Sequence, residues 1–133
     1  MDYIGDTSFL IGLWRRRAEG PERRFIDRHA DAVLVLPWIA KAEFLRGAVL
    51  ARHDPGTVTR FLSDYPVAWP SDLTLEIYAR TWAALAGSRQ MIGVHDLWIA
   101  ASALEHRLPV LTGNATEFRR VPDLAVADVH QQA

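Results

Sequence analysis

Three acidic residues lie far apart in the sequence, each beside an apolar segment. Asp6 directly follows the apolar stretch YIG, Glu43 lies within KAEFLRGAV, and Asp96 lies within VHDLWIAASAL. Carboxylates are the side chains that bind hard divalent cations and that exchange protons during hydrolysis. If the fold gathers these three side chains, they can hold Mg²⁺ or Mn²⁺ and activate a water molecule.

Each of the three acids also has a purely structural interpretation. Asp6 can cap the helix that follows it, since Asp is among the best N-cap residues. Glu43 can pair with Arg46, three residues later on the same helix. Asp96 can interact with the dipole at the start of a helix. Taken one at a time, these residues do not decide between structure and chemistry, and both roles can coexist in Asp6.

A further group of polar residues lies near the end of the chain, in the segment LTGNATEF. Asn114 follows Gly113, which is typical of a turn or of the cap of a short helix. Thr112 offers a hydroxyl, and Glu117 offers a fourth carboxylate. This segment is therefore a second candidate contributor to the same site.

The elements that would position these residues alternate between strands and helices. Short, continuously apolar runs predict buried strands at 33–36 and 109–112, with further candidates at 3–5 and 66–69 and an edge strand at 124–127. Helical patterns fill the gaps at 7–17, 22–29, 39–50 and 56–63. A further helix is predicted from an N-cap at Ser71 to a stop at Gly87, and another begins at Asp96. This alternation predicts an α/β fold around a mostly parallel sheet.

A parallel sheet would bring the polar residues together. Ligands bind beyond the carboxyl ends of such strands, and right-handed crossovers bring those ends to one edge. Asp6 ends the first candidate strand, the helix that carries Glu43 follows the second, and Thr112 ends a later one. Carboxylates gathered at this edge repel one another, and this repulsion raises the pKa of at least one of them. A bound divalent cation would relieve the repulsion.

The composition excludes several other kinds of site. There is no cysteine, so disulfides, thiolate catalysis and Cys-based zinc sites are excluded. The five histidines are scattered without an HExxH motif, so none has zinc-binding spacing. No apolar stretch approaches the roughly 20 residues of a membrane span, and the start lacks the basic region of a signal peptide. These features predict a cytoplasmic protein.

The size of the chain suits one domain. A length of 133 residues is sufficient for a single hydrophobic core. The composition predicts disorder only in a short tail after Asp128. The net charge of −1 gives no general attraction to nucleic acid.

Four segments, in order and at matching intervals, resemble the PIN domain, most closely that of VapC-type toxins from bacterial toxin–antitoxin pairs. They are DTSFL from Asp6, AEFLRG around Glu43, HDLWIAASAL around Asp96, and LTGNATEF. The resemblance covers essentially the whole chain. It implies a three-layer α/β/α sandwich, a single PIN domain over residues 1–133, and an Mg²⁺- or Mn²⁺-dependent endoribonuclease that hydrolyses RNA phosphodiester bonds.

The resemblance also implies roles for individual acids. Asp6, Glu43 and Asp96 correspond to catalytic acids, and Asp6 and Asp96 to cation ligands. The fourth acidic position of the family falls near Asn114, which is neutral, and Glu117 is the nearest carboxylate. This departure leaves open which of the two fills the position, and whether one or two cations bind.

The supporting residues follow from the same comparison. Ser8 corresponds to the hydroxyl near the first acid, and Thr112 is a candidate contact for substrate or water. The family implies a cognate VapB-like antitoxin, a homodimer, and a hetero-oligomer with that antitoxin. The apolar, Arg-flanked first helices are the predicted docking groove.

Two other functions compete with the ribonuclease. A catalytically weak or inactive PIN-fold module that binds RNA or protein is favoured by the neutral Asn114 and disfavoured by the three retained acids. A phosphatase or phosphorylated receiver would need further acids where Ser8 and Leu36-Pro37 stand. The sequence therefore favours the nuclease.

Overall fold

A single parallel sheet forms the centre of the protein. The computed structural model describes residues 2–16 and 19–132, and in these ranges five strands pair in the order β3-β2-β1-β4-β5, all in parallel. The strands are β1 (Tyr3–Gly5), β2 (Leu34–Pro37), β3 (Val67–Ala68), β4 (Val110–Thr112) and β5 (Val126–Asp128). The mostly parallel sheet predicted from the sequence is confirmed.

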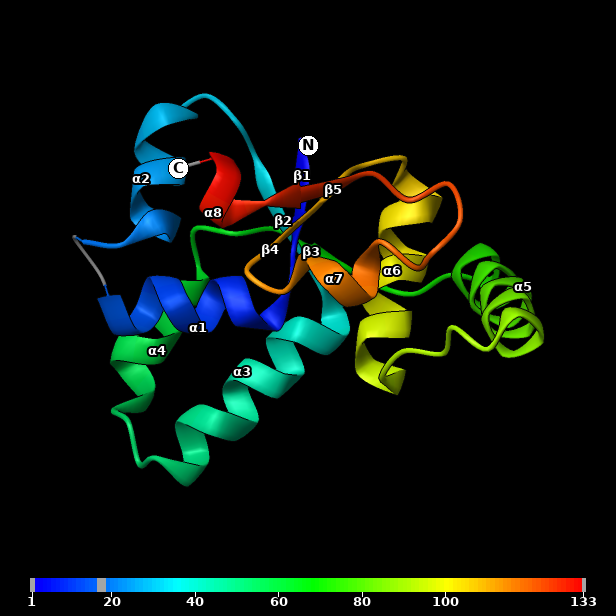
Figure 1. The fold of residues 1–133 in the computed structure, drawn as a ribbon. Coiled ribbons are helices and arrows are strands. Elements are labelled where there is room, and N and C mark those ends of the chain that lie inside the picture. The colour runs from blue at the N-terminus through cyan, green and yellow to red at the C-terminus, as the bar shows by residue number, and fades with distance from the viewer. Residues whose placement is uncertain (1, 17–18, 133) are drawn as a thin grey trace.

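Helices cover both sides of this sheet. They are α1 (Thr7–Arg16), α2 (Pro21–Arg28), α3 (Trp38–Leu50), α4 (Pro55–Leu62), α5 (Asp72–Ser88), α6 (Val94–His106), α7 (Ala115–Phe118) and α8 (Val129–Gln132). Figure 1 shows α1, α2 and α4 on one side of the strands and α5 and α6 on the other. The predicted α/β sandwich is confirmed. The predicted first helix extended to Arg17, which lies outside the described residues.

The core explains the apolar runs of the sequence. All four residues of β2 and all three of β4 are buried, as expected for strands covered on both faces. In α6, Leu97, Ile99 and Ala100 are fully buried, and this helix contacts β1 and β4. The sheet and α6 are thereby fixed relative to each other. Within the described ranges, no helix is long and apolar enough to cross a membrane.

The predicted stop of the fifth helix is wrong by two residues. Ser71 does cap α5, in a capping box with Thr74. The helix nevertheless passes through Gly87 to Ser88, and Arg89 takes the left-handed conformation (φ 57°) that ends it. Leu85 is 1% exposed, so its packing holds the last turn helical beyond the glycine.

The predicted disordered tail after Asp128 is also wrong. Asp128 ends β5, and α8 follows at once. Val129 is fully buried, and α8 packs against α2. A single buried side chain therefore anchors this end of the chain beside the carboxyl ends of the strands.

An ion pair between the half-exposed Arg16 and the buried Glu22 joins α1 to α2. Glu22 is 2% exposed and accepts from Arg16, whose Nε lies 2.9 Å from Oε1 and whose Nη2 lies 2.7 Å from Oε2. Gly12 makes this approach possible, because a Cβ at this position would lie 2.5 Å from the carboxyl carbon of Glu22. The two helices are held against each other by this contact.

Candidate active site

Asp6 lies at the carboxyl end of the central strand and is buried, with 3% of its surface exposed. Its Oδ1 accepts from the backbone N–H of Phe9 at 2.9 Å, so it caps α1. The same carboxylate accepts from the hydroxyl of Ser8 at 2.8 Å and from the hydroxyl of Thr112. The structural role of Asp6 as a helix cap is therefore real, and it fixes the carboxylate at the edge of the sheet.

Burial is the main influence on the ionisation of Asp6. It raises the pKa of this carboxyl, while the hydrogen bonds from Thr112, Phe9 and Ser8 oppose the rise. The negative charge of Glu43 raises the pKa further. Two of the three predicted acids are thus close enough to influence each other.

Glu43 connects three helices. Its side chain is 17% exposed, and its Oε1 accepts from the hydroxyl of Thr7 in α1 at 2.7 Å. Its Oε2 lies 2.7 Å from Nδ1 of His95 in α6. The pairing with Arg46 also exists, but at 4.0 Å it is the longest of these contacts. The contacts of Glu43 across the site therefore outweigh its contact within α3.

The sequence analysis assigned no role to His95. Its position directly before Asp96 gives no signal, because adjacent residues on a helix do not face the same way. The structure places its ring against Glu43 with 45% of its side chain exposed. His95 is therefore part of the wall of the site.

Asp96 lies in the first turn of α6, and its ionisation is also perturbed. Burial, followed by a hydrogen bond to the Glu117 side chain and the negative charge of Glu117, raises its pKa to about 7. The charges of Asp6 and Glu43 add to the rise. The charges of the other three acids therefore all act on Asp96.

The two candidates for the fourth acidic position, Asn114 and Glu117, make different contacts. Asn114 occupies the N-cap position of α7, but its side chain makes no capping hydrogen bond. Its backbone N–H donates to the Thr112 hydroxyl at 2.8 Å. Glu117, one helical turn later, is the residue whose carboxyl reaches Asp96. Glu117 thus joins the acids, and Asn114 supports the turn.

The donor set suits a hard divalent cation. Four carboxylates and neighbouring hydroxyls offer the oxygen ligands that Mg²⁺ and Mn²⁺ prefer. The hydrogen bond between the carboxyls of Asp96 and Glu117 needs a proton, and a cation can replace that proton. In the part of the chain that the structure describes, however, no three acidic or histidine side chains form a ready-made cluster for a metal ion. The side chains would have to move toward a bound cation.

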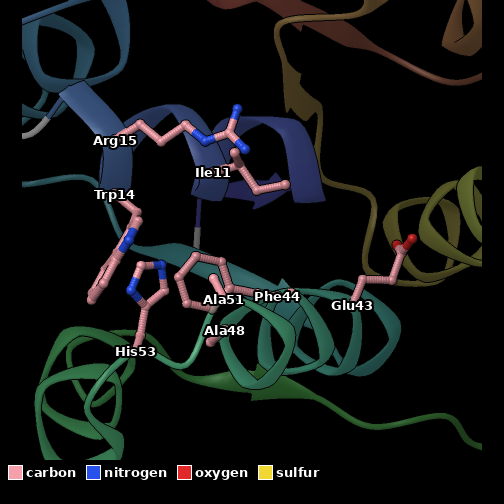
Figure 2. A pocket seen from close by; sticks show the side chains of 9 residues that line it. Ile11, Trp14, Arg15, Glu43, Phe44, Ala48, Ala51 and His53 are labelled. Atoms are coloured by element: carbon pink, nitrogen blue, oxygen red, sulfur yellow. The ribbon is translucent and has the colours of Figure 1, made fainter.

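A groove between α1 and α3 lies beside the acids. It encloses about 110 Å³ and is lined by Ile11, Trp14, Arg15, Glu43, Phe44, Gly47, Ala48, Ala51 and His53. Figure 2 shows Trp14, His53 and Phe44 together at one end, with the Glu43 side chain projecting at the other. The Trp14 and Phe44 rings pack edge to face, with centroids 5.7 Å apart. The groove thus runs from an aromatic cluster to an acid of the site.

Comparison with known sequences gives a consistent assignment. The family described as PIN domain matches residues 3–124. Among curated proteins, the chain is similar to Ribonuclease VapC1 of Haemophilus influenzae strain R2866, with 28% identity over 131 residues, which is 96% of this chain and 98% of that protein. The resemblance found in the four sequence segments is confirmed.

Solved structures show the same fold. VapBC2 from Rickettsia felis bound to a promoter DNA fragment matches with a TM-score of 0.87 and 21% identity, covering 96% of this chain and 98% of that one. VapBC-1 from nontypeable Haemophilus influenzae matches with a TM-score of 0.84 and 26% identity, covering 98% and 99%. A third match, at a TM-score of 0.66, 23% identity and 96% of each chain, is VapBC-5 from Mycobacterium tuberculosis, a member of the VapBC family of toxin–antitoxin systems.

Proposed function

Because the chain belongs to the PIN domain family, we propose that it is an endoribonuclease that acts as the toxin of a toxin–antitoxin pair. The observation that carries this proposal is the meeting of Asp6, Glu43, Asp96 and Glu117 at the carboxyl edge of the sheet. The likeness to Ribonuclease VapC1 over 96% of the chain supports the choice of RNA as the substrate. The chain would act as one domain, in the cytoplasm.

The proposed cofactor is Mg²⁺ or Mn²⁺. Asp6 and Asp96 would hold the cation, with Glu117 replacing its hydrogen bond to Asp96 by a shared interaction with the metal. When bound, the cation supplies a water of lowered pKa and stabilises negative charge on the scissile phosphate. The raised pKa values of Asp6 and Asp96 support this assignment. Burial is the first cause of both rises, and neighbouring carboxylates add to it. A bound cation would favour the ionised form of both acids.

The residues of the chain have separate tasks in this reaction. Ser8 and Thr112 donate to the Asp6 carboxylate and fix its direction. Glu43, held from both sides by Thr7 and His95, accepts a hydrogen bond from the attacking water and orients it for in-line attack. Water then breaks the phosphodiester bond without a covalent enzyme intermediate. The resemblance implies products with a 5′-phosphate and a 3′-hydroxyl.

The test is cleavage of single-stranded RNA by the purified chain in Mn²⁺. Asp6→Asn keeps a side chain that can accept the hydrogen bonds of the helix cap but removes the negative charge. We expect the cleavage rate to fall by at least about 100-fold, because removing one group that stabilises charge in the transition state typically has an effect of this size. Asp31→Asn is the matched control, because it makes the same change in an exposed turn residue outside the group of acids. Equal cleavage by wild type and Asp6→Asn would refute the proposal.

The proposed partner is a VapB-like antitoxin that occupies the groove between α1 and α3. The aromatic end at Trp14 and Phe44 suits an apolar side chain. At the other end Glu43 would pair with an antitoxin Arg, which can bind a carboxylate through two parallel hydrogen bonds. The homodimer and the hetero-oligomer with antitoxin stay predictions from the resemblance.

The inactive-module alternative loses its main support. It depended on the neutral Asn114, and Glu117 supplies a carboxyl beside Asp96 instead. This contact favours the nuclease over the inactive module.

A further inference from the structure

The ends of β4 and β5 border a second part of the site. Thr112 of β4 pairs with Asp128 of β5, so the residues that follow these strands emerge side by side. Gly113 follows β4, and Val129 and His130 follow β5. His130 thus lies at the same carboxyl edge as Asp6, although the two are separated by almost the whole sequence.

Gly113 leaves a small space open at this point. A Cβ at position 113 would lie 3.5 Å from Nε2 of His130, 3.7 Å from Oγ of Ser8 and 3.8 Å from Cγ1 of Val129. The same Ser8 hydroxyl donates to Asp6 at 2.8 Å and accepts from the Gly113 N–H at 3.3 Å. The space that His130 borders is therefore one hydrogen bond away from a site acid.

The imidazole of His130 is positioned but not used. Its backbone N–H donates to Asp128 at 2.9 Å, and the buried Val129 fixes the turn before it. Across the described residues, no hydrogen bond joins either ring nitrogen of His130 to another group. The charge of His130 acts on Glu22, but both carboxylate oxygens of Glu22 already accept from Arg16. An exposed donor group thus faces the solvent beside the acids.

RNA needs such a donor at this place. Four carboxylates repel the phosphates on either side of the bond that is cut, and a cation offsets this repulsion only where it binds. Protein contacts to phosphate oxygens set the register of a nucleic-acid strand. On the β5 side of Asp6, His130 is positioned to make this contact.

Building on the proposed ribonuclease function, we propose that His130 is a substrate-positioning residue. It binds the backbone phosphate next to the scissile one, on the exposed side of the edge that Ser8 and Gly113 form. Its contact is to phosphate, so it contributes affinity and register without choosing the base sequence.

The test measures RNA binding separately from cleavage. A fluorescein-labelled single-stranded RNA of about 12 nucleotides, within the usual range of site sizes, is titrated with the protein in EDTA and followed by anisotropy. We expect His130→Ala to weaken binding about fivefold, the effect of one lost charge-assisted hydrogen bond at a surface. The slope of log affinity against log salt should fall by about 0.7, the value for one phosphate contact on a single strand.

Three further variants distinguish contact from a structural effect. His130→Arg should restore both affinity and salt slope, because Arg also binds phosphate. Gly113→Ala should weaken binding by filling the space. Gln131→Ala, which changes the neighbouring residue that contacts Arg119 at 3.3 Å, should bind as wild type does. Equal thermal unfolding midpoints for all variants would show that each one folds.

The outcomes separate this inference from the proposed function. A wild-type chain that cuts RNA in Mn²⁺, with unchanged affinity and salt slope in His130→Ala, would overturn the role of His130 alone. Loss of antitoxin binding with unchanged RNA binding would also overturn it, and would assign His130 to the partner. A wild-type chain that neither binds nor cuts RNA would overturn both.

Discussion

The Asp96 carboxyl holds its proton more tightly than an ordinary aspartic acid does. Two ionised carboxylates can only accept hydrogen bonds, so a hydrogen bond between Asp96 and Glu117 requires a proton on one of them. The pKa of Asp96, raised to about 7 by burial and by Glu117, expresses this at the level of one residue. Around neutral pH, the site can exchange that proton for a cation.

This ionisation predicts a pH dependence of stability without divalent cations. The pKa of Asp96 is near 3.8 in the unfolded chain and about 7 in the folded one, so the folded state binds the proton more tightly. The contribution of Asp96 protonation to the free energy of unfolding is fully present below pH 3.8 and is lost as the pH rises through about 7. Asp6, whose pKa burial also raises, acts in the same direction.

Thermal unfolding in EDTA measures this effect. The difference in midpoint between wild type and Asp96→Asn, which mimics the protonated acid, should become less favourable to wild type from pH 4 to pH 8. Added Mn²⁺ should reverse the trend, because cation binding displaces protons. A difference that is constant over this pH range would contradict the raised pKa.

A second prediction concerns the fourth acid. Glu117→Gln should weaken Mn²⁺ binding, measured by calorimetry, by about tenfold, the lower end of the effects seen when a group near a metal site is removed. Asn114→Asp is the informative counterpart, because it adds a charge at the position that the family comparison indicated. If Asn114→Asp strengthened Mn²⁺ binding more than Glu117→Gln weakened it, Glu117 would not be the fourth acid.

The sequence allowed part of this site to be predicted. Asp6, Glu43 and Asp96 each stand at a point where a parallel fold must place them at one edge, so their meeting followed from the strand pattern. The strand pattern does not predict the choice between Asn114 and Glu117, because the two residues are about one helical turn apart and the fold decides which of their side chains faces Asp96. The sequence pattern gives no place for His130, because it predicts no element after Asp128, where the structure has α8.

At the scale of elements, the contact between α1 and α2 depends on one glycine. A Cβ at position 12 would lie 2.5 Å from the buried Glu22 carboxyl, and 2.7 Å from Nη2 of Arg16. The Arg16–Glu22 pair occupies the space that a side chain would need. Because α1 begins at the Asp6 cap, a shift of this helix would also reach the site.

Gly12→Ala should therefore destabilise the protein by about 1–3 kcal/mol, as overpacking of a filled interior does. Gly87→Ala is the control, because nothing lies within 4 Å of its added Cβ and Ala favours helix over Gly by up to about 1 kcal/mol. Urea unfolding of both variants measures the difference. If Gly12→Ala were as stable as Gly87→Ala, the proposed close packing would be wrong.

The helices and strands were predictable to different degrees. Strand 3–5 coincides with β1. The strand predicted at 33–36 is shifted by one residue from β2 at both ends, and the strand predicted at 109–112 begins one residue before β4. Helix ends depend on side-chain packing that local patterns do not contain. Gly87 is the clearest case, since glycine usually follows a helix, but here buried Leu85 carries the helix past it.

At the scale of the whole molecule, the groove between α1 and α3 is the surface through which an antitoxin would act. Ala51 lines this groove, while its neighbour Leu50 is 78% exposed and does not line it. The same large substitution at these two positions therefore separates occupation of the groove from a general surface effect.

Growth of a bacterial host expressing the chain gives the measurement. We expect arrest that Asp96→Ala relieves and that co-expression of the cognate antitoxin relieves. Ala51→Trp should still arrest growth, but the antitoxin should relieve this arrest less well. We expect at least about tenfold fewer colonies, which corresponds to a loss of about 1.4 kcal/mol in the binding of the antitoxin to the chain. Leu50→Trp should behave as wild type. Equal relief of both Trp variants would place the antitoxin elsewhere.

Glu43 belongs both to the wall of the groove and to the group of acids. A protein segment that captures this carboxylate would take it away from the cation site. The two binding events are then coupled, and thermodynamics makes the coupling symmetric. If binding of the segment lowers the affinity for Mn²⁺ by some factor, Mn²⁺ must lower the affinity for the segment by the same factor. The concentration of the cation in the cell would therefore change how readily the complex dissociates.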